Sequence, residues 1–229
     1  MLKVVKYGQR DKIYGYPEAC GFGDMWAVTS YLLRISEETA RPTKFFTRSQ
    51  NFKSTIQSIL PLLQSKGKIE FIGGQAAQRM FNYCEPYKVK FVPTIKTWTK
   101  NDNRIIAYQF DGSHLSETKN INENRLIWLL NNLIKMGYKP INIGGKQSIE
   151  FIVDTLAKAE LFVGCPSGLS IAALSVGTPI FLITKMLKVD FVRFLRSCQY
   201  HTKPVKMFRT ANQFLFYLNQ EFKLYQAQC

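Results

Sequence analysis

Short apolar runs alternate along the chain with longer segments whose apolar residues recur every three or four positions. The short runs predict β-strands, and the periodic segments predict helices. The strand candidates are, in order, LKVVKY, KFFT, IEFIG, VKFVPTI, RIIAYQF, KPINIGG, ELFVGC, TPIFLIT and VKMF. The helix candidates between them are MWAVTSYLLRISEE, NFKSTIQSILPLLQS, QAAQRMFNYC, NENRLIWLLNNLIKMG, SIEFIVDTLAKA, LSIAALSVG and LKVDFVRFLRSC. This alternation predicts an α/β protein with parallel sheets covered by helices on both faces.

Two of the helices carry clear boundary signals. Leu126, Leu129 and Leu133 recur at helical spacing, and Gly137 follows them as a stop signal. Ser148 precedes the next periodic segment and is a good N-cap residue.

The polar segment TKNDNR, residues 99–104, is the best candidate for a linker. We therefore expect an N-terminal domain over residues 1–103 and a C-terminal domain over residues 104–207. A final helix within residues 208–229 is rich in apolar side chains. We expect this helix to pack back on the N-terminal domain.

The charge balance is strongly basic, with 31 Lys and Arg against 16 Asp and Glu and a formal net charge of +15. Such a field attracts polyanions, and the candidates are nucleic acid, an anionic membrane surface and a phosphorylated glycan. The alternative is that the lysines only solvate the surface. The charge alone does not choose between them.

Cysteine usage and apolar stretches bear on metal sites and location. The chain has five Cys, an odd number, without a C-x-x-C pair, and only two His. A zinc site is therefore unsupported, and scattered reduced thiols suit an intracellular protein. No signal peptide is evident, and the apolar stretches are too short to span a bilayer. We expect a cytoplasmic protein, with peripheral contact at the inner face of a membrane as a further expectation.

The segment Gly21-Phe22-Gly23-Asp24 precedes the first long helix. Two glycines before a helix let the backbone approach a ligand closely, and Asp24 follows near the helix N-terminus. The alternative is that Asp24 is an N-cap, which satisfies free N–H groups of the first turn.

The segment GCPSG follows the strand candidate ELFV and precedes the helix candidate LSIAALSVG. Its glycines loosen the turn, its serine offers a hydroxyl, and backbone N–H groups point out of the helix N-terminus. This arrangement favours a diphosphate, although it also fits an ordinary strand-to-helix turn. The candidate ligand-binding residues in it are Gly164, Pro166, Ser167, Gly168 and Ser170.

Two further loops follow strand candidates, where ligands of parallel sheets bind. The first contains Asp111, Gly112 and Ser113, with Lys119 just beyond, and the second contains Gly144, Gly145 and Gln147. Lys119 can meet a phosphate, but these loops also read as solvated connections. No D-x-D carboxylate pair occurs in the sequence. We therefore expect a site that needs neither a metal nor another cofactor.

Three stretches together resemble the heptosyltransferase-like glycosyltransferases of family nine and the autotransporter heptosyltransferases. GFGDMWAVTSYL looks like their G-x-G-D turn and helix, and ENRLIWLLNNLIKMGYKPINIGG looks like their helix–strand unit ending in two glycines. ELFVGCPSGLSIAALSVGTPIFLI looks like their donor signature, G-x-D-[ST]-G-x-x-H-x-A-x-x-x-G-x-P. The resemblance implies a GT-B architecture of two Rossmann-like domains facing a cleft. The N-terminal domain would take the acceptor, with Asp24 as catalytic base, and the C-terminal domain would take the donor.

The sequence departs from the family pattern in four places. The acidic position of the signature is Pro166 and its histidine position is Ile171. The loop after the glycine pair is shortened, and residues 9–19 form an insertion before the G-x-G-D turn. The identity of the donor therefore does not follow from the resemblance.

The resemblance implies a metal-independent inverting glycosyltransferase that moves a sugar from a nucleotide-sugar to a hydroxyl of an anionic acceptor. The acceptor would be a surface glycan or a lipid-linked saccharide. One alternative is a DNA glucosyltransferase of the phage type, which the basic charge fits equally well. Others are an enzyme similar to UDP-sugar 2-epimerases and a degenerate module that binds without catalysis.

Overall fold

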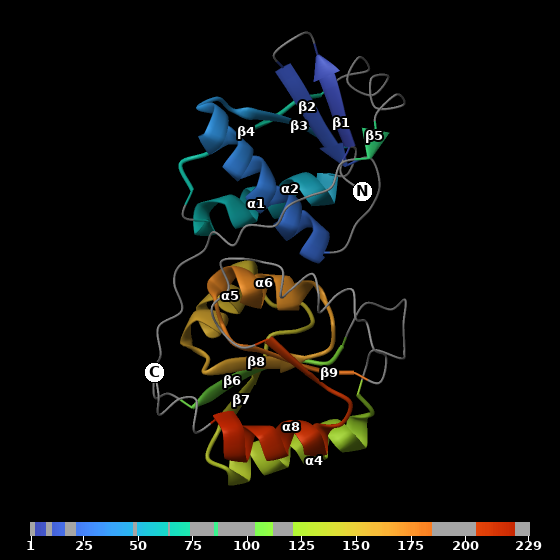
Figure 1. Cartoon of the computed structure of the whole chain (residues 1–229), viewed down its shortest axis with the longest axis vertical. Coiled ribbons are helices and arrows are strands. Elements are labelled where there is room, and N and C mark those ends of the chain that lie inside the picture. Colours follow the sequence, from blue (N-terminus) through green and yellow to red (C-terminus); the bar gives the residue numbers. More distant parts are fainter. Residues whose placement is uncertain are drawn as a thin grey trace. The chain divides into compact units, whose positions relative to one another are not determined.

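The computed structural model divides the chain into two compact units, Met1–Lys96 and Thr97–Cys229 (Figure 1). It describes the ranges 3–7, 11–16, 22–47, 50–63, 65–73, 85–86, 104–111, 121–184 and 205–222. No helix in the described ranges has both the length and the apolar character needed to cross a membrane.

The N-terminal unit is built on a five-stranded sheet with the order β4-β3-β2-β1-β5. Its strands are β1 (Lys3–Tyr7), β2 (Asp11–Tyr16), β3 (Thr43–Thr47), β4 (Ile69–Phe71) and β5 (Glu85–Pro86). Strands β2, β3 and β4 are parallel, whereas β1 is antiparallel to both β2 and β5. The sheet is therefore mixed, and the expectation of a wholly parallel sheet is wrong for this unit.

Strand β2 corrects the interpretation of residues 9–19 as an insertion. It forms a hairpin with β1 and occupies the centre of the sheet, between β1 and β3. The segment DKIYGY contains charged residues and a glycine, so its local sequence does not resemble a buried parallel strand. Its pairing with two neighbouring strands gives it a place that its local sequence does not predict.

Two helices, α1 (Phe22–Thr39) and α2 (Gln50–Ile59), lie together on one face of this sheet (Figure 1). A short 3-10 turn, Leu60–Leu62, continues α2. The core between helices and sheet centres on Phe45, whose ring meets those of Phe52 and Phe71 edge to face, with centroids 5.6 and 6.1 Å away. Such aromatic pairs add stability beyond the area that they bury. This core holds α1 and α2 against the sheet.

The end of α1 is tied to the turn before β4 by Glu37. Its Oε1 accepts hydrogen bonds from Ser65 Oγ at 2.6 Å and from the Lys66 N–H at 2.9 Å. These donors favour the charged carboxylate, and the hydrogen bond from Ser65 is the largest of the causes that lower the pKa of Glu37 below its ordinary value. The ionised form of Glu37 is therefore the form that stabilises this corner.

We expect Glu37→Gln to lower the melting temperature at pH 7 by an amount that disappears as the pH falls. Because folding lowers the pKa of Glu37, its contribution is complete above the ordinary value of about 4.3 and is lost below it. Thermal unfolding of both proteins between pH 7 and pH 3 measures this difference. Glu70→Gln, at an exposed position of β4, controls for the loss of one charge. A difference that stays constant over this pH range would contradict the role given to the Glu37 carboxylate.

The C-terminal unit is built on a wholly parallel five-stranded sheet with the order β10-β9-β8-β6-β7. Its strands are β6 (Ile105–Gln109), β7 (Lys139–Asn142), β8 (Leu161–Gly164), β9 (Ile180–Ile183) and β10 (Val205–Phe208). Its helices are α4 (Glu123–Lys135), α5 (Ile149–Lys158), α6 (Gly168–Val176) and α8 (Ala211–Tyr217). Helices α5 and α6 cover one face of the sheet, and α4 and α8 cover the other (Figure 1). The α/β fold predicted from the sequence is confirmed here.

The residues predicted to mark helix ends in this unit do so in the structure. The Ser148 hydroxyl accepts a hydrogen bond from the Phe151 N–H at 3.2 Å and caps α5. Gly137 follows α4 with a φ of 84°, a left-handed conformation that costs glycine little. At the other end of α4, the Asn122 side chain accepts from the Asn124 N–H at 2.9 Å. Local capping chemistry therefore sets these helix ends.

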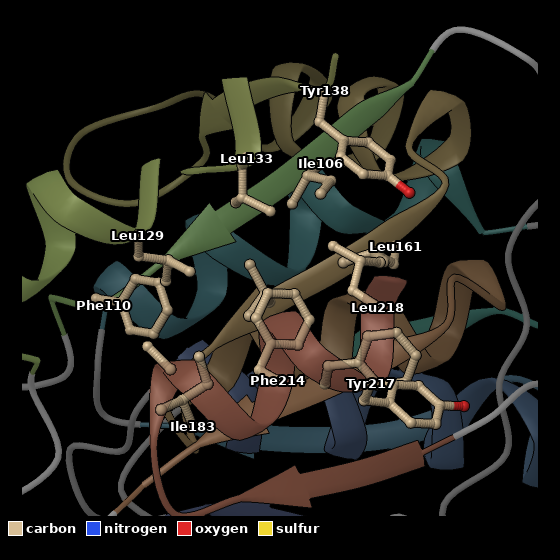
Figure 2. Close-up of a cluster of buried hydrophobic side chains, with 13 residues drawn as sticks. Ile106, Phe110, Leu129, Leu133, Tyr138, Leu161, Ile183, Phe214, Tyr217 and Leu218 are labelled. Atoms are coloured by element: carbon tan, nitrogen blue, oxygen red, sulfur yellow. The ribbon is translucent and has the colours of Figure 1, made fainter. Parts of the chain in front are cut away.

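Aromatic side chains from β9, β10 and α8 fill the core between the sheet and the helices α4 and α8. Figure 2 shows Phe214 and Tyr217 of α8 among side chains of the strands and of α4. Phe181 of β9 lies 6.0 Å from Phe214 and 5.4 Å from Tyr217, measured between ring centroids. The described part of the C-terminal helix thus packs on its own unit. The expectation that the helix also packs on the N-terminal domain stays a prediction.

Candidate functional site

The connections of the C-terminal sheet diverge at the carboxyl ends of β6 and β8. Strand β7 lies on one side of β6, and β8, β9 and β10 lie on the other side. The chain passes from β6 to β7 in one direction and then crosses to β8 in the other. Ligands of open α/β sheets bind in the crevice outside such a switch point. The topology therefore marks the residues that follow β6 and β8.

Gln109, the last residue of β6, connects the loops at this edge. Its side chain is only 4% exposed. Its Oε1 accepts a hydrogen bond from the Ser167 hydroxyl, and its Nε2 donates to the backbone carbonyl of Asp111, each at 2.5 Å. The Cys165 N–H donates to the Gln109 carbonyl at 3.1 Å. The end of β6 is thus fixed to the turn that follows β8.

Asp111 connects the same edge to the loop after β7. A Cβ atom added at Gly144 would collide with the Asp111 carboxylate, so this close approach requires glycine. The Gly144 N–H donates to the Asn142 side chain at 2.8 Å. Burial, and then the charge of Asp111, raises the pKa of Tyr108 above its ordinary value. Tyr108 is therefore a neutral phenol at physiological pH.

The turn from β8 into α6 is tightly built. Gly164 pairs with Gln109 in the sheet, and a Cβ atom there would collide with the Gln109 carbonyl oxygen. The buried Ser170 hydroxyl donates to the Cys165 carbonyl and accepts from the Ser167 N–H, both at 3.4 Å. The Ser170 N–H donates to the Ser167 carbonyl at 3.1 Å. Ser170 thus closes the turn.

Both the N–H and the hydroxyl of Ser170 make hydrogen bonds within the turn. A contribution of Ser170 to ligand binding stays a prediction. The first N–H groups of a helix have no partner inside that helix. Those of Gly168 and Leu169 are therefore the donors that this turn can offer to an anion. The Ser167 hydroxyl gives its proton to Gln109, so its oxygen has only acceptor capacity left.

The structure brings several predicted site residues to one edge of the sheet. These are Asp111, Gly144, Gly164, Ser167 and Gly168. Gly145 and Gln147 are exposed in the loop that follows. Pro166 is buried within the turn. Ile171, at the histidine position of the family signature, points into the core with 5% of its surface exposed.

Several predicted residues cannot be placed in this way. Gly21, Gly112, Ser113 and Lys119 lie outside the described residues. So do the strand predicted at VKFVPTI and the helices predicted at QAAQRMFNYC and LKVDFVRFLRSC.

Phe22, Gly23 and Asp24 form the first turn of α1. The helix begins three residues earlier than predicted, so Asp24 is not its N-cap.

Gln109 is the residue that sequence reasoning missed. The strand candidate RIIAYQF contains it as a single amide near the end of an apolar run. A buried side-chain amide needs hydrogen-bond partners, so a glutamine at that place signals a polar network at the strand end. This signal was available in the sequence, whereas the identity of its partners was not.

No group of three or more His, Cys, Asp or Glu within the described ranges is placed to hold a metal ion. Cys165 is buried at the start of the β8–α6 turn, with its Sγ 4.0 Å from Gln109 Oε1. It therefore belongs to the polar network around Gln109.

Comparisons with known proteins give similarity only at the level of solved structures. No protein-family model matches the sequence, and no curated protein matches it. The iron-containing dodecameric glycosyltransferase TibC from enterotoxigenic E. coli H10407 aligns with 76% of this chain at 16% identity and a TM-score of 0.46. The dodecameric iron-containing heptosyltransferase TibC in complex with ADP-D-beta-D-heptose aligns with 91% at 15% identity and a TM-score of 0.47. This chain spans 57% of the first of these proteins and 68% of the second.

Proposed function

We propose that the protein is a metal-independent inverting glycosyltransferase whose C-terminal unit binds a nucleotide-sugar donor at the carboxyl ends of β6 and β8. The observation that carries the proposal is the network of Gln109, Ser167 and Asp111 at the switch point, beside the N-terminus of α6. The sequence resemblance to heptosyltransferase-like enzymes supports the same assignment. An α/β unit of this kind hosts many functions, so the assignment rests on this site.

The diphosphate of the donor is assigned to the N-terminus of α6. The N–H groups of Gly168 and Leu169 and the positive end of the helix dipole favour negative charge at that place. The absence of a side chain at Gly168 lets phosphate oxygens approach the backbone. Ser113 and Lys119 are proposed to act from the opposite loop, as the sequence suggested.

Asp111 is assigned a different partner, because its carboxylate repels a diphosphate. A carboxylate accepts hydrogen bonds from hydroxyl groups, and an acidic residue beside a switch point commonly binds ribose hydroxyls. Its place against Gly144, beside the Gln109 network, suits the ribose or the transferred sugar. The neutral phenol of Tyr108 adds no negative charge near this position.

The chemical step is assigned to Asp24 in the first turn of α1. Its carboxylate takes the proton of an acceptor hydroxyl while the oxygen attacks the anomeric carbon. The bond between this carbon and the diphosphate breaks, and the nucleoside diphosphate leaves with the electron pair toward α6. Attack opposite the leaving group inverts the configuration. This function requires the two units to face each other across donor and acceptor, as in GT-B enzymes.

The acceptor is proposed to be anionic, because the chain carries a formal net charge of +15. A phosphorylated glycan or a lipid-linked saccharide at the inner face of a membrane has the required charge. Modified DNA is the alternative acceptor. The acceptor is not needed for a first test, because glycosyltransferases that bind a donor can transfer its sugar slowly to water.

The test is to incubate the protein with a panel of nucleotide-sugars, with and without EDTA, and to measure the released nucleoside diphosphate. The proposal predicts release from at least one donor at the same rate in both conditions. A changed sugar that stays attached to its nucleotide would instead indicate an epimerase. The proposal would be contradicted if no donor were bound or hydrolysed, either alone or with glycan, lipid-linked or DNA acceptors. The non-catalytic binding module would then be the remaining alternative.

A further inference from the structure

A basic groove lies in the N-terminal unit, away from the carboxyl ends of its strands. It is an open hollow of about 680 Å³ at the end of α1 and at the amino ends of β3 and β4. Arg41, Lys66 and Lys68 line it, together with Glu37 and Ser36. Its size falls in the range of about 300–1,000 Å³ that is usual for small-molecule sites.

A buried hydroxyl fixes the two loops that carry these cations. Ser36, with 4% of its surface exposed, donates a hydrogen bond to the Arg41 carbonyl at 2.7 Å and accepts one from the Lys68 N–H at 2.8 Å. Gly67 lies so close to α1 that a Cβ atom there would collide with the Leu33 carbonyl oxygen. The backbone that presents Arg41, Lys66 and Lys68 is therefore held in one arrangement, which lowers the cost of ordering it around a ligand.

The groove keeps a net positive charge. Three cations face one carboxylate, and the Glu37 carboxylate already accepts from Ser65 and from the Lys66 N–H. The C-terminal end of α1 adds roughly half a negative charge. About one and a half positive charges remain unmatched by these groups. Glu37 and the C-terminal end of α1 therefore do not neutralise the three cations, which leaves positive charge for a ligand.

We propose that this groove binds the phosphate group of a small phosphorylated molecule. A phosphate monoester carries about −1.5 to −2 charges and three strong acceptor oxygens, which match three cationic side chains. The guanidinium of Arg41 can hold two of these oxygens at once. The groove belongs to the N-terminal unit and lies at the amino ends of its strands, whereas the proposed donor site belongs to the C-terminal unit. The groove is therefore a second anion site and does not depend on the glycosyltransferase assignment.

The Glu37 hydrogen bonds allow a test in which one variant strengthens binding. Both donors meet the same atom, Oε1, so the carbonyl oxygen of glutamine can accept both after Glu37→Gln. This variant removes the negative charge and retains an acceptor for both donors, at the cost of the charge-dependent part of the stability of this corner. A charge at about 4 Å is worth about 1 kcal/mol in water, or about fivefold in affinity. Glu37→Gln should therefore bind phosphate about two- to fivefold more tightly, and Lys66→Gln with Lys68→Gln at least tenfold more weakly.

The measurement is a titration of the full chain with inorganic phosphate, and separately with glucose 6-phosphate, followed by amide NMR shifts. Saturating shifts at Arg41, Lys66 and Lys68 are expected. Tighter binding of glucose 6-phosphate would assign the groove to a sugar phosphate, and equal binding would assign it to the phosphate group alone. Lys139→Gln, an exposed lysine of the other unit, is the matched control and should change nothing.

Two results would overturn the proposal. One is the absence of saturating shifts at the groove with either probe. The other is unchanged affinity in the folded Lys66→Gln, Lys68→Gln double variant. Gly168→Asp should leave phosphate binding at the groove intact, so a failure of the donor site and a failure of the groove are distinguishable.

Discussion

Replacing Phe181 by alanine is expected to lower the free energy of unfolding of the C-terminal unit by about 3–5 kcal/mol. Phe181 is fully buried on β9, and its ring centroid lies 5.4 to 6.0 Å from those of Tyr217, Phe208 and Phe214. Truncation removes the buried ring and leaves a cavity between the sheet and α8, which rigid neighbours fill poorly. Urea unfolding followed by circular dichroism measures the loss.

Phe216→Ala is the matched control for this prediction. Phe216 lies on the same helix as Phe214 but is 68% exposed. Its removal should change the free energy of unfolding by no more than about 0.5 kcal/mol. Equal effects of the two substitutions would contradict the packing of α8 on the C-terminal sheet.

Asp24→Asn is expected to lower the rate of donor turnover by about 10²–10⁴-fold, the range for a lost general base. Asparagine has the shape of aspartate but cannot take the proton of the acceptor. Asp24 lies in the first turn of α1, where a negative charge stabilises the helix by only about 0.3–1 kcal/mol. The fold and the donor affinity should therefore be retained. Release of nucleoside diphosphate and transfer of the sugar to an acceptor are the two readouts.

The control for Asp24 is Glu38→Gln, which removes an exposed carboxylate farther along the same helix. It should leave turnover unchanged. Wild-type transfer rates in folded Asp24→Asn protein would end the catalytic assignment. A fall in rate that comes with lost donor binding would instead assign Asp24 to binding.

The features of the C-terminal unit that could be predicted are those set by local sequence. Leu129 and Leu133 recur at the spacing of one helix face and are buried. Ser148 caps the start of α5 and Gly137 follows the end of α4, each through interactions within a few residues. The continuously apolar strand LFVG is buried at every position, as expected for the centre of a parallel sheet. The alternation of such apolar strands with helices was therefore enough to indicate the fold of this unit.

The features that could not be predicted depend on contacts between distant parts of the chain. Strand β2 is polar in part, and only its pairing with β1 and β3 identifies it. The apolar face of α8 was visible in the sequence, but the partner of that face was not. Ser167 was predicted as a site residue, yet its hydrogen bond to Gln109 joins residues 58 positions apart. Tertiary contacts determine these features, and the hydrophobic periodicity of the sequence does not reveal such contacts.

Calorimetric titration of nucleoside diphosphates against the wild type and Gly168→Asp tests the proposed donor site at the N-terminus of α6. Micromolar binding of at least one nucleoside diphosphate to the wild type is expected. Affinity roughly 5- to 1,000-fold weaker is expected for Gly168→Asp, because charges this close repel by about 1 to 4 kcal/mol and every 1.4 kcal/mol is about tenfold in affinity. An aspartate in the first turn favours the helix, so the variant should fold. Asn131→Asp, on the exposed side of α4, adds the same charge elsewhere and should bind normally. Equal affinity in folded Gly168→Asp, or no binding of any nucleotide by the wild type, would contradict the donor site.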